Sequence, residues 1–186
     1  RQTGNKEGEA NQLGNIGNIH QEKGNIDSAL KYFQQALNLI KKAGNKEGEA
    51  VQLGNIGSLY LEKGNYEETL KSFKEALYIY KKIGKKAGEA SKLCNIGVVY
   101  QKKGDMDEAL KYYKLALNIF TMIGDNNGEG IVLNNLGNIY KENGDNEEAL
   151  KNYKLALIIF KQVGNLPNEG ETLNNIALVY KNLKDK

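Results

Sequence analysis

The chain has 186 residues, of which 40% are hydrophobic and 21 are glycine, a composition typical of folded protein. Its formal net charge of +3 is too small to indicate nucleic acid or an anionic membrane as the partner. One cysteine, Cys94, excludes an internal disulfide, and one histidine, His20, leaves a metal site almost no ligands, so we expect no metal and no cofactor. No apolar stretch is long enough to cross a bilayer and no signal peptide is recognisable, so we expect a cytoplasmic protein.

The sequence repeats every 40 residues from end to end. Leucine recurs at Leu13, Leu53, Leu93, Leu133 and Leu173, and glycine recurs at Gly4, Gly44, Gly84, Gly124 and Gly164. This period predicts a solenoid in which each unit packs mainly against its neighbours. We expect one array over residues 1–186, cut from a longer protein, with units 5–44, 45–84, 85–124 and 125–164 and a partial unit 165–186.

Each unit is predicted to be a pair of antiparallel helices. In the first unit, apolar residues have helical spacing over residues 6–22 and again over 26–42, as in Leu30, Phe33 and Leu37. Gly24 and Gly44 suit the left-handed residue that ends a helix. The same boundaries, repeated every 40 residues, predict helices up to 166–182.

Two further recurring features predict contacts. The second helix of most units opens with Asn or Asp followed three residues later by Glu, as in Asn65 and Glu68, which predicts a capping box. Mid-helix glycines such as Gly17 are costly in a helix, so we expect them to permit close packing against alanines of the Ala29 type. A recurring glutamate, of which Glu49 is one, predicts a contact between units, with a partner that the sequence does not identify.

These residues resemble the tetratricopeptide repeat. The third unit follows the family pattern W-x2-L-G-x2-Y, A-x3-F and A with Leu93, Ile96, Gly97, Tyr100, Ala109, Tyr113 and Ala116. Leucine replaces the family's tryptophan, and the family's proline is absent, which allows longer helices and fits a period of 40. This variant is similar to the repeats of kinesin light chains and spindle-orientation adaptors. The resemblance implies an all-α fold, a right-handed superhelical solenoid of antiparallel helix pairs whose first helices line the concave side.

One column on the expected concave side is constant. The second residue after each Leu13-type leucine is asparagine, at Asn15, Asn55, Asn95, Asn135 and Asn175. Asparagine is a mediocre helix former, and no capping role exists in mid-helix. Because its carboxamide both donates and accepts, a ladder of asparagines is suited to binding the backbone of an extended peptide. The alternative is that each carboxamide bonds a neighbouring helix and sets the repeat geometry.

Neighbouring positions of the same face are variable and would set specificity. The expected peptide-contacting residues are Asn18, Ser58, Val98, Asn138 and Leu178, together with Glu62, Lys102 and Glu142. Apolar positions beside an acidic rim favour a basic or mixed segment with apolar anchors.

The sequence therefore predicts a non-enzymatic module that binds a protein or peptide segment, and no nucleic acid or membrane. Two alternatives stay open. One is a regulatory sensor domain that responds to a peptide, and the other is a self-assembling scaffold that associates end to end through the 166–182 helix. His20 takes the place of Tyr60 and its equivalents and is predicted to serve packing, whereas Cys94 is predicted to be an inert small residue.

Overall fold

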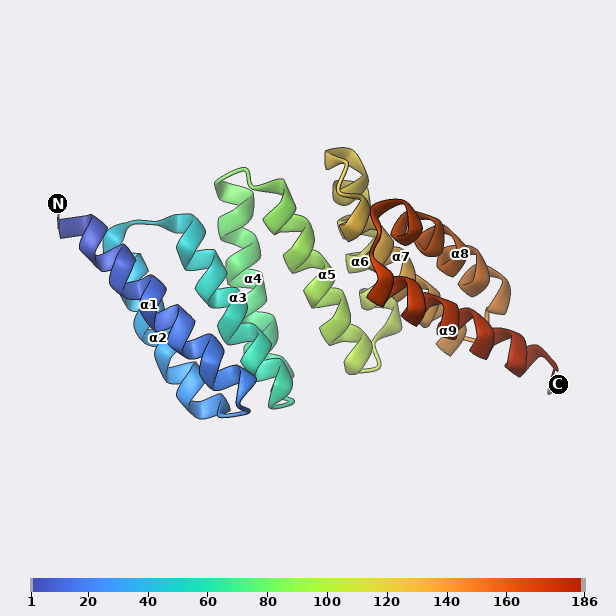
Figure 1. Cartoon of the computed structure of the whole chain (residues 1–186), viewed down its shortest axis with the longest axis horizontal. Coiled ribbons are helices and arrows are strands. Elements are labelled where there is room, and N and C mark those ends of the chain that lie inside the picture. The colour runs from blue at the N-terminus through green and yellow to red at the C-terminus, as the bar shows by residue number, and fades with distance from the viewer. Residues whose placement is uncertain (1, 185–186) are drawn as a thin grey trace. The chain divides into compact units, whose positions relative to one another are not determined.

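A computed structural model describes residues 2–184, with side chains from residue 6 onward. The predicted all-α fold is confirmed, since all regular structure in this range is helical (Figure 1). The nine helices of residues 2–184 are α1 (Gln2–Glu22), α2 (Ile26–Ala43), α3 (Lys46–Glu62), α4 (Tyr66–Lys82), α5 (Lys86–Lys102), α6 (Met106–Ile123), α7 (Asn126–Glu142), α8 (Asn146–Val163) and α9 (Leu166–Lys184). The predicted array also includes residues 1, 185 and 186, which lie outside the described residues.

The predicted boundaries are confirmed to within two residues except at the start of α1. That helix begins at Gln2 and continues through Gly4 and Asn5, where a turn was expected. In the next unit the equivalent turn is held by two hydrogen bonds, from Gly44 N–H to the Lys41 carbonyl and from Asn45 N–H to the carbonyl of Ile40.

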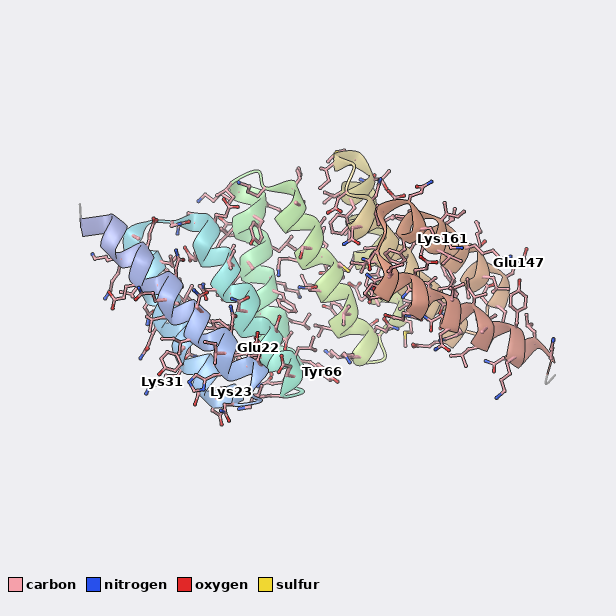
Figure 2. All side chains as sticks on the ribbon, in the orientation of Figure 1. Glu22, Lys23, Lys31, Tyr66, Glu147 and Lys161 are labelled. Carbon is pink, nitrogen blue, oxygen red and sulfur yellow. The ribbon has the colours of Figure 1, made fainter. Side chains whose placement is uncertain are left out.

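The chain divides into two compact units, residues 1–92 and 93–186, with the boundary inside α5. We call α1, α3, α5, α7 and α9 the first helices and α2, α4, α6 and α8 the second helices. In the first unit α2 packs against α1 and α3, and α3 packs against α4. In the second unit α7 packs against α6 and α8, and α8 packs against α9. Figure 2 shows Lys23, which follows α1, and Tyr66, which begins α4, at the same end of the first unit.

Left-handed glycines close the turns, as predicted. Gly64 has φ of +71°, and its N–H bonds the Leu61 carbonyl while the next N–H, that of Asn65, bonds the Tyr60 carbonyl. This pair of bonds is a Schellman motif, which satisfies carbonyls at the end of a helix. Positive φ is found at Gly24, Gly44, Gly64, Gly84, Gly104, Gly124, Gly144 and Gly164.

The capping boxes are only half formed, which corrects the prediction. The Asn65 side chain accepts a hydrogen bond from the Glu68 N–H at 3.3 Å. The reciprocal bond from the Glu68 carboxylate has no donor, because the Asn65 N–H is already used in the Schellman motif. The carboxylate instead lies 3.6 Å from Lys71 Nζ. The same arrangement recurs at Asp105 and Asp145, whereas Asn25 makes no side-chain cap bond.

The mid-helix glycines accommodate aromatic rings. A Cβ atom on Gly57 would lie 2.6 Å from the Phe73 ring, and one on Gly97 would lie 2.7 Å from the Tyr113 ring. The nearest atoms are thus those of the ring, while the small residue expected as the partner, four positions before each ring, is fully buried; it is alanine at Ala29, Ala109 and Ala149 and threonine at Thr69. In each hairpin, a buried aromatic ring of the second helix thus packs against the mid-helix glycine of the first helix.

The recurring glutamate joins neighbouring hairpins, as predicted. Glu49 lies 2.8 Å from Lys46 Nζ on its own helix and 3.8 Å from Lys41 Nζ near the end of the preceding second helix. Glu89 makes the equivalent pairs with Lys86 and Lys81. The partner missing from the sequence analysis is thus the lysine eight residues earlier. For Glu129 of the fourth unit the position eight residues earlier is Thr121, at the end of the third unit, so this glutamate has no equivalent lysine there.

Candidate functional site

The asparagine column changes environment along the chain. Asn15 is exposed, Asn55 in the first unit is half-buried, and Asn95 and Asn135 in the second unit are half-buried as well. Asn175 is only 9% exposed. The five side chains are therefore not equivalent, although the sequence repeats them without variation.

The residue before each asparagine explains this difference. Within the second unit, the column asparagine of one first helix faces the residue that precedes the column asparagine of the previous first helix. Asn175 Nδ2 lies 3.4 Å from Asn134 Oδ1, and Asn135 Nδ2 lies 3.8 Å from Cys94 Sγ, each pair 41 residues apart. Sulfur is a weak acceptor, so the second contact uses little of the hydrogen-bonding capacity of Asn135.

Asn134 makes Asn175 part of a buried polar network. The Asn134 carboxamide oxygen also accepts from Thr172 Oγ1 at 3.2 Å, and its nitrogen donates to Glu171 at 3.3 Å. Buried amides need partners of this kind, because an unsatisfied one costs about 1–3 kcal/mol. Asn175 therefore has the structural role that was the alternative explanation for the whole column.

In the first unit, the position 41 residues before Asn55 is Gly14, which offers no side-chain acceptor. Within the described part of the chain, the carboxamides of Asn15, Asn55 and Asn95 make no hydrogen bond with another residue. Their donors and acceptors remain available to solvent or to a ligand.

Two of the variable positions beside the asparagine column are already hydrogen-bonded within the protein. The Ser58 hydroxyl donates to the Gly54 carbonyl at 3.2 Å, and Asn138 accepts from the Tyr153 hydroxyl at 2.7 Å. Val98 is half-buried, whereas Asn18 and Leu178 are exposed. Asn18 and Leu178 are therefore open to solvent, and Val98 is partly so.

The glutamates of the acidic rim, Glu62 and Glu142, are each hydrogen-bonded to the preceding first helix. Gln21 donates to Glu62, and Gln101 donates to Glu142 at 3.0 Å. Gln101 in turn accepts from the Tyr113 hydroxyl at 3.0 Å. The sequence analysis missed Gln101, for which the signal is a glutamine placed 41 residues before each of these glutamates.

Four of the predicted residues line one cleft in the second unit. This cleft of about 330 Å³ is lined by Val98, Gln101, Lys102, Tyr113, Asn135 and Glu142. It combines an apolar side chain, one cation, one carboxylate and the half-buried carboxamide of Asn135. These groups are suited to a polypeptide backbone with mixed side chains, because they offer donors, acceptors and both charges within one concavity.

Burial raises the pKa of the Tyr113 phenol, and electrostatic interactions with Cys94 and then with Glu142 raise it further. The pKa of Tyr153 is raised by burial and then by Glu142 and Glu171. Both phenols therefore remain protonated through the neutral range and donate the hydrogen bonds described above.

This pKa shift predicts a loss of stability at alkaline pH. Above about pH 10 the tyrosines ionise in the unfolded chain but not in the folded one, so the free energy of unfolding falls as pH rises. The Tyr113→Phe/Tyr153→Phe variant should show a flatter decline in melting temperature between about pH 9 and 12. Tyr78→Phe, at a tyrosine exposed in the folded state, should decline like the parent protein. An unchanged slope in the double variant would contradict the assignment.

No metal centre is found among the residues that the structure describes. In that range no three His, Cys, Asp or Glu side chains are grouped so as to hold a metal ion. His20 stacks on Tyr32 with ring centroids 5.2 Å apart, much as Tyr100 stacks on Tyr112 at 5.4 Å. No helix of residues 2–184 combines the length and the apolarity needed to cross a membrane.

The helical hairpins and their repeated contacts define a tetratricopeptide-like solenoid protein. Sequence patterns of the tetratricopeptide repeat match residues 8–82, 49–122, 88–157 and 128–186. The chain therefore belongs to the tetratricopeptide repeat family. No curated protein matches it significantly.

Solved structures share the fold at low sequence identity. BtubC (BKLC) from P. vanneervenii is 21% identical with a TM-score of 0.81, and the match covers 94% of this chain and 73% of that one. A Signal Transduction ATPase with Numerous Domains with a tetratricopeptide repeat sensor, from Pyrococcus horikoshii, is 20% identical with a TM-score of 0.83. That match covers 94% of this chain but only 27% of the larger protein. Repeats of a putative kinesin light chain from Podosopora anserina are 14% identical with a TM-score of 0.75, covering 95% and 87% of the two chains.

Proposed function

We propose that this chain is a non-enzymatic, cytoplasmic interaction module, one array over residues 1–186, that binds an extended peptide segment along its first helices. Tetratricopeptide repeats generally mediate protein–protein interaction, which supports the broad assignment. The peptide-binding residues are Asn15, Asn55, Asn95 and Asn135, with Asn175 as a structural member of the same column.

The observation that carries the proposal is the unused hydrogen-bonding capacity of Asn55 and Asn95. Both side chains are half-buried inside a helical repeat, yet neither bonds another residue in the described range. Each carboxamide is able to donate to a peptide carbonyl and accept from a peptide N–H, and each such bond contributes about 0.5–1.5 kcal/mol. Because these contacts are made to the backbone, they place little constraint on the bound side chains.

Side-chain preference comes from the cleft beside Asn135. Val98 offers an apolar contact, while Lys102 and Glu142 offer one charge of each sign. Glu142 is already hydrogen-bonded to Gln101 and is held in place before a ligand arrives. This arrangement favours a segment of mixed charge with an apolar side chain.

The test is selection from a displayed library of random peptides about 12 residues long, which would extend over roughly 40 Å. Peptides selected on the parent protein are then titrated by calorimetry against the Asn55→Ala/Asn95→Ala/Asn135→Ala variant. Loss of three carboxamides that bind the peptide backbone should weaken binding by at least about tenfold.

The matched control is Asn38→Ala/Asn118→Ala, which removes two exposed asparagines from second helices. It should bind the selected peptides like the parent protein, and the triple variant should keep its helical melting curve. Equal affinity of the triple variant and the parent protein would refute the asparagine mechanism.

Self-association through α9 is a second candidate function, and the exposure of apolar side chains on α9 and α1 supports it. Leu173 on α9 is 45% exposed, whereas its equivalent Leu133 on α7 is 6% exposed. Ile19 on α1 is likewise 49% exposed, whereas the equivalent Leu59 is fully buried. End-to-end association of two copies would cover both surfaces. Sedimentation equilibrium should then show dimers that Leu173→Glu abolishes, and a monomer at all concentrations would exclude this candidate.

The sensor alternative concerns the same peptide site. The similar Pyrococcus horikoshii protein is described as having a tetratricopeptide repeat sensor, which keeps a signalling role under consideration for this chain. Such a role requires that bound peptide changes the conformation of the repeats. Small-angle scattering that is unchanged by a saturating selected peptide would argue against it.

A further inference from the structure

One face of α9 is apolar and is left open within the described part of the chain. Leu173, Ala177 and Tyr180 follow one another at helical spacing and are exposed, Leu173 and Tyr180 at 45% each. The residue of α7 at the position of Leu173 is Leu133, which is buried because it packs against Phe160 of α8. In the hairpin of α7 and α8, an antiparallel helix thus covers the face that α9 leaves open.

Ala177 makes this face unsuited to another helix like α8. The equivalent residue of α7 is Gly137, and a Cβ atom there would lie 2.6 Å from the Tyr153 ring of α8. Ala177 has this Cβ atom, so an aromatic ring placed in the same way would overlap with it. A helix that covers α9 therefore needs small or aliphatic side chains at this point, and α9 itself has them in Ile176 and Ala177.

The two ends of α9 carry opposite charges. Glu169 lies in its first turn, and Lys181 and Lys184 lie in its last turn. None of these three side chains forms an ion pair or a hydrogen bond with another described residue. Lys161 precedes Glu169 by eight residues but, unlike the lysines of the earlier units, is not paired with it. The other glutamate of α9, Glu171, is hydrogen-bonded to α7 and is not counted here.

We propose that α9 pairs in antiparallel orientation with α9 of a second copy of this chain, a pairing that rests on the self-association candidate above and names its surface. With the two-fold axis between Ile176 and Ala177, Leu173 of each copy lies opposite Tyr180 of the other. The same register places Glu169 of each copy beside Lys184 of the other. The face is thus complementary to itself, as an interface between identical surfaces requires. A parallel pair would instead bring like charges together, which is unfavourable.

The pairing is measured by sedimentation equilibrium of the full chain at low ionic strength, over about 1–500 µM. A single helix pair buries less than the roughly 1,200 Å² of a stable interface, so dissociation at micromolar concentrations is expected. Glu169→Lys alone, and Lys181→Glu/Lys184→Glu alone, should each weaken the dimer by about tenfold or more. The reason is that two charge contacts become repulsive in each symmetric dimer.

A mixture of the two charge variants identifies the surfaces in contact. When the Glu169→Lys chain meets the Lys181→Glu/Lys184→Glu chain, every charge contact of an antiparallel α9 pair again joins opposite charges. The mixture should therefore form heterodimers with about the affinity of the parent protein. The chain that carries all three changes should likewise dimerise by itself. Neither recovery is expected if α9 contacts a different surface of the second copy.

Two leucines of α9 provide a matched pair of controls. Leu173→Glu should abolish the dimer, whereas Leu178→Glu should leave it intact, because Leu178 is 42% exposed on another face of the same helix. Both side chains are exposed, so both variants should fold, as circular dichroism would verify. The Asn55→Ala/Asn95→Ala/Asn135→Ala variant should dimerise like the parent protein, which separates this surface from the peptide site.

The possible failures differ in what they overturn. A monomer at every concentration would overturn the α9 pair together with the self-association candidate. Dimers that Ile19→Glu abolishes, and that the charge variants of α9 leave intact, would overturn the α9 pair alone and assign the contact to α1. Failure of the two charge variants to associate when mixed would also overturn the antiparallel pair.

Discussion

Phe73→Ala should lower the free energy of unfolding by about 3–5 kcal/mol, the largest single effect expected for this chain. The Phe73 ring is 1% exposed and fills the space directly over Gly57, so its removal leaves a cavity that the two helices cannot close without moving. Urea unfolding followed by circular dichroism measures the change.

The matched control for this prediction is Tyr78→Ala, five residues later on the same helix. That side chain is mostly exposed, so its removal should alter stability by no more than about 0.5 kcal/mol. Similar losses for the two variants would mean that the ring of Phe73 does not hold α4 against α3.

Gly57→Ala should destabilise the protein by about 1–3 kcal/mol, although alanine is the better helix former. The added methyl group would meet the Phe73 ring at 2.6 Å, and a buried ring cannot move aside without disturbing the core. Gly170→Ala is the matched control, because a Cβ atom there would meet nothing within 4 Å. It should stabilise α9 by about 1 kcal/mol.

A double variant tests the contact itself. In a Phe73→Leu background, the additional cost of Gly57→Ala should shrink, since the smaller side chain leaves room for the methyl group. Thermal and urea unfolding of the four proteins provide the coupling energy. Purely additive losses would show that Gly57 is required for another reason.

Much of the fold follows from local residue patterns. The helix ends could be predicted because glycine alone tolerates the left-handed turn and because Asn or Asp begins the next helix, as at Gly64 and Asn65. Three-dimensional contacts were less predictable. The capping box is only half formed because the Asn65 N–H is already bonded, and the atoms nearest to Gly57 belong to the Phe73 ring, which extends farther than the small side chains expected there.

The candidate site was harder to predict because its chemistry depends on pairs of helices. The asparagine column is uniform in sequence, but the residue 41 positions earlier, Gly14 for Asn55 and Asn134 for Asn175, decides whether a carboxamide is free or hydrogen-bonded within the protein. That pairing is offset by 41 residues rather than by the period of 40, so comparison of repeats at equal positions does not find it.

The most direct test of the central claim follows the asparagine side chains themselves. Hydrogen–nitrogen correlation spectra of isotope-labelled protein are recorded with and without a library-selected peptide, with side-chain amides assigned by single substitutions. The resonances of Asn55, Asn95 and Asn135 should shift, while those of Asn38, Asn118 and the buried Asn175 should stay. Peptide binding that leaves Asn55 and Asn95 unmoved would contradict the account.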